Sequence, residues 1–195
     1  MTTKTTQKPA QKSVRTEVRQ PITFDLVSML APSHTGAEKI SAAFGLDPVD
    51  YHGIREATEE MIGRSARTMQ PTVNETAMRI HLQRIVGAFV ASAHGAAVFY
   101  GTRQTAARDL TAKLANEDRD EDREGVYGFE SRAARARGFA AQAGLTTYAL
   151  LAAAEGAVHA YAEITGEDWK PYTPPPVASV SVNRRSAAAE IEALG

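Results

Sequence analysis

Two runs without any formally charged side chain lie inside a stretch that has no proline between residues 72 and 170. The runs span residues 85–101 and 138–154, and both are rich in alanine and glycine. A helix that is apolar on almost every side is normally buried on several sides. We therefore expect two long helices, over 73–115 and 129–165, that pack against each other and against further helices.

Start and stop signals predict the bounds of these and of two shorter helices. Capping boxes at 35–38 and 72–75 begin the helices over 36–44 and 73–115. The pair Asp47-Pro48 begins a helix over 48–69, which Pro71 stops. Gly45 and Gly166 end helices, and the turn between the long helices is expected at 125–128. Residues 21–34 are expected to form a short segment packed on the body.

Small residues recur at four-residue spacing on both long helices, and such rows let another backbone come close. The predicted packing or oligomer-interface residues are Gly87, Ala91 and Gly95 on the first helix and Ala152, Gly156 and Ala160 on the second. We expect the two helices to pair antiparallel through these rows. The fold prediction is an all-α bundle built on a long antiparallel helical hairpin, with extended tails at both ends.

The composition changes at both ends of the predicted bundle, which is expected over 21–170. Residues 1–20 read as a basic flexible arm, because few of their side chains can be buried. Residues 171–195 begin with a proline-rich extended strap. The arm is the candidate contact for nucleic acid or another anionic partner, through Lys4, Lys8, Lys12, Arg15 and Arg19.

Motifs for catalysis are missing from the sequence. It has no cysteine, no phosphate-binding glycine loop and no nucleophile elbow. Glu155, His159 and Glu163 share one helix face, but the Glu-x-x-His pairs of di-iron bundles are absent. The acidic turn at 118–131 begins like a calcium loop, yet Ser131 stands where a bidentate glutamate is needed. We predict no catalytic, cofactor-binding or metal-binding residue, and both groups are interpreted as solvated polar surface.

A membrane hairpin is the competing interpretation of the two apolar runs. It is disfavoured because a span needs about 20 apolar residues, and because the mean hydropathy of the chain is −0.30. The first 20 residues lack the apolar core of a secretory signal. The expected location is the cytoplasm or a virion.

These features predict a non-enzymatic structural subunit of a multi-subunit particle. Two helices cannot cover surfaces that are apolar all round, so self-association or contact with other subunits is expected. The most concrete version is a bacteriophage virion protein, capsid-associated or at a connector, whose tails contact neighbouring subunits. The alternatives are a nucleic-acid- or plasmid-associated accessory protein, a metal-binding bundle enzyme and a membrane-associated hairpin.

Overall fold

The computed structural model describes residues 21–70, 73–117 and 123–172. Its five helices are α1 (Phe24–Leu30), α2 (His34–Phe44), α3 (Tyr51–Met69), α4 (Glu75–Glu117) and α5 (Arg123–Thr165). Helix accounts for 84% of the described residues, and none of them forms a strand. The all-α class and the helical-bundle packing are therefore confirmed. The predicted arm at 1–20 and most of the strap, 173–195, lie outside the described residues.

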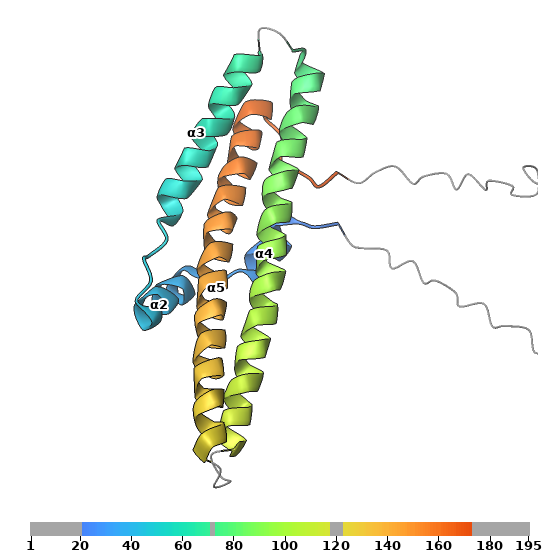
Figure 1. The fold of residues 1–195 in the computed structure, drawn as a ribbon. Helices are drawn as coiled ribbons and strands as arrows, with labels where there is room; N and C mark the ends of the chain where they lie inside the picture. Colours follow the sequence, from blue (N-terminus) through green and yellow to red (C-terminus); the bar gives the residue numbers. More distant parts are fainter. Residues whose placement is uncertain (1–20, 71–72, 118–122, 173–195) are drawn as a thin grey trace, which may run out of the picture.

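The helices α4 and α5 stand side by side along their length, and the shorter helices lie around them (Figure 1). The start of α4 lies near the end of α5, as Arg79 pairs with Glu167, two residues beyond α5. Further along, the ring of Tyr100 lies 2.9 Å from the position that a Cβ would take at Gly144. Helix α3 packs on α5, on the side away from α4 (Figure 1). As a result, α4 forms one edge of the bundle.

The helix ends agree with the predictions at glycine and proline and differ at several caps. Gly45 and Gly166 adopt left-handed backbone angles, with φ of 61° and 70°, and end α2 and α5. At the start of α2 the cap is Ser33, whose hydroxyl accepts from the Gly36 amide at 3.2 Å, two residues before the predicted Thr35. At the start of α3, the carboxylate of Asp50 accepts from the Gly53 amide at 2.9 Å. The Asp47-Pro48 start was therefore wrong by three residues.

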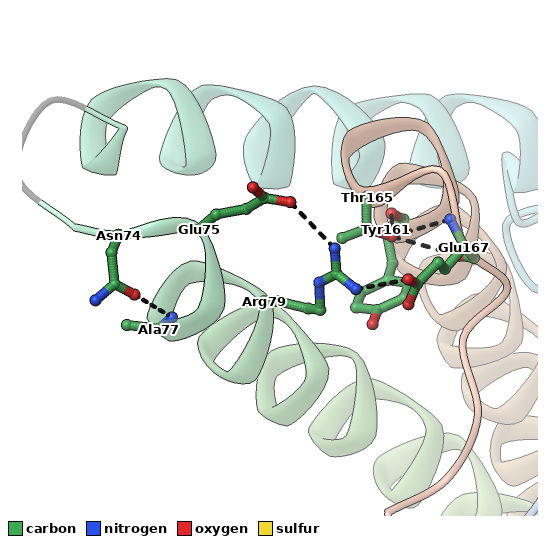
Figure 2. A network of polar contacts seen from close by, with 7 residues as sticks. All are labelled: Asn74, Glu75, Ala77, Arg79, Tyr161, Thr165 and Glu167. Atoms are coloured by element: carbon green, nitrogen blue, oxygen red, sulfur yellow. Dashed lines mark hydrogen bonds and ion pairs between the residues drawn. The ribbon is translucent and has the colours of Figure 1, made fainter.

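Both long helices also begin differently from the prediction. Asn74 accepts from the Ala77 amide at 2.8 Å and caps α4 (Figure 2), whereas Thr72, the predicted cap, lies outside the described residues. Helix α5 already begins at Arg123, so residues 125–128 are helical and do not form the expected turn. Glycine lowers helix propensity by only about 1 kcal/mol, which the pairing of two long helices can offset.

A seam of buried side chains runs along α4 where it faces α5. Most of its members are three or four residues apart, as in a coiled coil, and they are Leu82, Val86, Val90, Ala93, Ala97, Tyr100 and Ala107. Val27 of α1 is fully buried against the same cluster, which confirms that residues 21–34 pack on the body. The core near the start of α4 thus contains Val and Leu, and the α4–α5 contact toward the end of α4 relies on alanine.

Polar contacts hold the start of α4 to the chain that follows α5 (Figure 2). The guanidinium of Arg79 lies 3.1 Å from the Glu75 carboxylate and 2.5 Å from that of Glu167. The amide of Glu167 donates to the hydroxyl of Thr165 at 3.3 Å. The chain then runs back over α4, where the indole of Trp169 donates to the carbonyl of Gln83 at 3.4 Å.

The two rows of small residues do not meet each other, in contrast to the prediction. On α5, Ala152, Gly156 and Ala160 are buried, and a Cβ at Gly156 would stand 2.3 Å from the Arg55 carbonyl of α3. On α4, Ala91 and Gly95 are exposed. No atom of the described residues lies within 4 Å of the Cβ position at Gly87 or Gly95, leaving out the helix's own nearby backbone. The α5 row therefore packs on α3, while the α4 row faces outward.

Helix α3 buries few of its large apolar side chains. Ile62 is buried, but Ala57 is exposed and the Met61 side chain is 51% exposed. The helix instead buries Thr58 and Ala66. Its small residues at the contact allow the close approach to Gly156.

Candidate functional site

A polar seam joins α3 to α5 at the place where their backbones come closest. The Tyr51 hydroxyl donates to Glu155 Oε2 at 2.5 Å, and Arg55 Nη1 lies 3.7 Å from Glu155 Oε1. These partners are 104 and 100 positions apart in the sequence. Burial, together with the bond to Glu155, raises the pKa of Tyr51 above its usual range. The phenol therefore stays protonated at neutral pH and serves as a hydrogen-bond donor.

The face that carries Glu155, His159 and Glu163 is occupied by side chains of α3. His159 Nδ1 lies 3.4 Å from Glu59 Oε1 and 3.9 Å from Glu163 Oε1. Arg55 Nε lies 3.5 Å from the same Glu59 oxygen. Within the described ranges, no group of three or more histidine or acidic side chains is placed to hold a metal ion. These side chains contact one another across the α3–α5 interface.

A cavity of about 300 Å³ adjoins this seam, between the α1–α2 connection, α3 and α5. Its lining includes His34, Tyr51, His52 and Tyr148. The Tyr148 hydroxyl lies 2.6 Å from His34 Nδ1, and burial raises the pKa of Tyr148. The cavity is open to solvent through His34 and His52, which are exposed. These contacts fasten α2 and α3 to α5.

The most unusual surface lies on the face of α4 that points away from α5. Eight exposed residues follow one another in steps of four and three, so they form one line along the helix. We call this line the outward stripe, and its residues are Arg84, Ala88, Ala91, Gly95, Val98, Thr102, Thr105 and Asp109. Only the two end residues are charged, with opposite signs. Across about 37 Å of helix, the residues between them are small or apolar.

Exposed aromatic rings adjoin the outward stripe on one side. Phe99 of α4 is 50% exposed and Phe139 of α5 is 59% exposed. The Arg103 guanidinium lies over the Phe99 ring, 4.7 Å from its centroid, and 5.9 Å from that of Phe139. Together with Val98, which is 52% exposed, they extend the apolar surface from α4 onto α5. Contiguous apolar surface of this kind marks interaction sites on soluble proteins.

The length and composition of α4 also satisfy the criteria for a membrane span, and among the described helices α4 alone does so. Only 22% of its most apolar 18-residue window is buried. Charged side chains of α3 and α5 lie beside this part of α4. Glu155 falls between the two levels at which Arg79 meets Glu167 and Tyr100 meets Gly144, and Arg55 of α3 pairs with it. A bilayer around this part of α4 would have to accommodate those charges, at a cost of several kcal/mol.

Basic side chains predominate toward the end of α4 and the start of α5. Those with exposed side chains are Arg103, Arg108, Lys113, Arg132, Arg135 and Arg137. Two acidic residues, Asp109 and Glu130, lie among them. The acidic turn at 118–131 falls largely outside the described residues and side chains, as does the arm that carries Lys4 to Arg19.

Sequence reasoning found the apolar character of α4 and missed the direction in which it points. It singled out Gly87, Ala91 and Gly95, but not the four-three spacing that continues through Val98 to Thr105. The opposite charges of Arg84 and Asp109, at the two ends of this spacing, are the sequence signal that could have identified the stripe. No family model, no curated protein and no solved structure matches the chain. The surface of the molecule is therefore the guide to its function.

Proposed function

We propose that this chain is a non-enzymatic structural subunit of a multi-subunit assembly. Its scaffold would be a long antiparallel helical hairpin made of α4 and α5. The outward stripe and the adjoining Phe99 and Phe139 are the observation that carries the proposal. A monomeric protein seldom leaves so long an apolar helix face in water. A neighbouring subunit would cover this face and remove it from solvent.

The glycines of α4 support the same conclusion. A glycine in a helix interior costs about 1 kcal/mol relative to alanine. The Cβ positions of Gly87 and Gly95 stand in open space, so none of the described residues makes a contact there that offsets this cost. Close approach of a helix from another subunit would require the absence of a side chain at these positions. A virion protein, at the capsid or at a connector, is the most concrete form of the proposal.

Native mass spectrometry of the full chain, alone and mixed with lysate of its own source cells, tests the proposal. We expect species of higher mass that contain an integral number of copies. The variant Ala91→Glu places a charge in the middle of the outward stripe and should be excluded from them. Met61→Glu, at a half-exposed methionine of α3, is the matched control and should enter them normally. A wild-type chain that stays monomeric in both samples contradicts the proposal.

A nucleic-acid-associated role is the second candidate, and the basic residues toward the end of α4 and the start of α5 favour it. Arg108 of α4 and Arg137 of α5 line the same cavity, and Arg103, Lys113 and Arg135 are exposed on the same part of the two helices, so a polyanion could follow this end of the molecule. Binding of this kind weakens steeply with salt, by about one power of salt concentration for each phosphate contact. A titration of labelled duplex DNA between 50 and 200 mM salt (roughly the range in which such contacts are lost) measures the slope. Binding that does not respond to salt would exclude this role.

A further inference from the structure

The outward stripe has a symmetry that specifies its occupant. From Arg84 to Asp109 the spacing is four, three, four, three, four, three, four, and it reads the same from either end. A second copy of α4 placed antiparallel can therefore be aligned residue against residue. In that register Arg84 faces Asp109 of the partner subunit, and Gly95 faces Val98 of the partner subunit. We propose that the chain forms a two-fold symmetric dimer through antiparallel contact of the outward stripes of two α4 helices.

Charge complementarity selects the antiparallel arrangement over the parallel one. The two-fold axis generates two ion pairs, one at each end of the contact, because each copy contributes both an arginine and an aspartate. In a parallel pair, Arg84 would face Arg84 of the partner subunit and Asp109 would face Asp109 of the partner subunit, and like charges in register are repulsive. The residues between the charges carry none, so the ends of the stripe determine the register.

The size of the side chains fits close packing of two helices. Ala88 would face Thr105 of the partner subunit, and Ala91 would face Thr102 of the partner subunit. Each pair sets a small residue against a residue of moderate size, which allows the helix axes to approach to about 8 Å, the lower end of the usual range. This contact accounts for Gly95, whose Cβ position is open within the monomer.

The area of the contact predicts a reversible dimer. A strip about 37 Å long and about 10 Å wide buries roughly 400 Å² on each copy. The total of about 800 Å² lies just below the approximately 1,000 Å² expected of a stable interface. Phe99, at the border of the stripe, adds apolar area if it turns toward the partner. We expect association in roughly the micromolar range rather than the nanomolar range.

Charge reversal tests both the contact and its direction. Sedimentation equilibrium of the full chain at low salt, over a concentration series, would be measured for the wild type, Arg84→Asp, Asp109→Arg and the double variant. Each single reversal places two like-charge pairs in the dimer and should weaken association by about tenfold. The double variant exchanges the charges and should restore it. Circular dichroism verifies that each variant remains helical, and Met61→Glu, which lies outside the stripe, should dimerise as the wild type does.

Several outcomes overturn the inference. They are a wild-type chain that remains monomeric at about 100 µM, roughly a hundredfold above the expected dissociation constant, single reversals without effect, and a double variant that is not restored. Single reversals without effect on a chain that still dimerises are the result expected of a parallel pair, because each position would then face its own copy and a reversal would leave like charges in register. Recovery of the chain with phosphatidylcholine–phosphatidylglycerol vesicles, prevented by Ala91→Glu, would assign the stripe to a membrane instead.

The inference rests on the proposed assembly role, and the two can fail separately. A chain that stays monomeric alone but enters a larger complex in the lysate overturns the dimer and leaves the assembly role in place. A chain that dimerises through the stripe but joins nothing larger supports the dimer and contradicts the larger particle.

Discussion

Replacing Gly156 with alanine introduces one methyl group at the closest approach of α3 and α5. The new Cβ would stand 2.3 Å from the carbonyl oxygen of Arg55, and 3.1 Å from its carbonyl carbon. Both are backbone atoms, so no side chain can rotate away, and α3 must move outward by about 1 Å to reach an ordinary contact distance. Overpacking of this kind costs about 1–3 kcal/mol, and the upper part of the range applies to a backbone obstacle.

Helix propensity acts in the opposite direction and has to be subtracted. Alanine favours the helix over glycine by up to about 1 kcal/mol, which leaves a net destabilisation of about 2 kcal/mol for Gly156→Ala. The matched control is Gly95→Ala on the outward stripe, where the Cβ position is open. This substitution should retain the propensity gain and stabilise the chain by up to about 1 kcal/mol. The two variants should thus differ by about 3 kcal/mol although their chemical change is identical.

Thermal and urea unfolding, followed by circular dichroism at a concentration low enough to keep the chain monomeric, measure this difference. At about 2–4 °C for each kcal/mol in a chain of this size, we expect Gly156→Ala to lower the melting temperature by about 4–8 °C. Gly95→Ala should raise it by about 2–4 °C. If Gly156→Ala melts at the wild-type temperature or above, α3 does not lie against α5 at this position. If Gly95→Ala is destabilised as strongly as Gly156→Ala, the assignment of the two faces is wrong.

Three further predictions concern parts of the chain outside the stripe. The pKa of Tyr51 is raised in the folded state, so its stabilisation is complete below about pH 10, where the unfolded phenol is also protonated, and decreases as the pH rises toward the folded-state pKa. The stability difference between the wild type and Tyr51→Phe should therefore be constant from pH 7 to about 9 and shrink above about pH 10 in urea unfolding; an unchanged difference at the higher pH would contradict the bond to Glu155. Trp169→Ala removes a half-buried ring and its bond to the Gln83 carbonyl, and should lower the free energy of unfolding by about 2 kcal/mol, somewhat less than a fully buried ring; a loss below about 0.5 kcal/mol, the size of a neutral surface change, would mean that the ring does not pack on the body. Removal of residues 1–20 takes away none of the described core, so helicity and melting temperature should be unchanged, and an unfolded product would place the arm in the core.

Local sequence determined which segments are helical and where most of them stop. The stretch without proline from 72 to 170 gives two long helices, and Pro71 prevents α3 from continuing beyond its observed end at Met69. Gly45 and Gly166 adopt positive φ, which glycine alone tolerates without strain. Local sequence specified the helix starts less closely, because several residues that can cap a helix follow one another. Ser33 and Thr35 precede α2, and tertiary packing decides which of them accepts the first free amide.

The tertiary structure alone decided what each helix face meets. Gly95 and Gly156 stand in similar rows of small residues, and nothing local distinguishes them. Helix α3 lies on α5 and reaches α4 only slightly, so it covers Gly156 and leaves Gly95 exposed. The seam between Tyr51 and Glu155 likewise joins residues 104 positions apart. A pattern along the chain indicates that a face can be buried. The segment that covers this face depends on where distant segments pack, because their contacts compete for the same apolar surface.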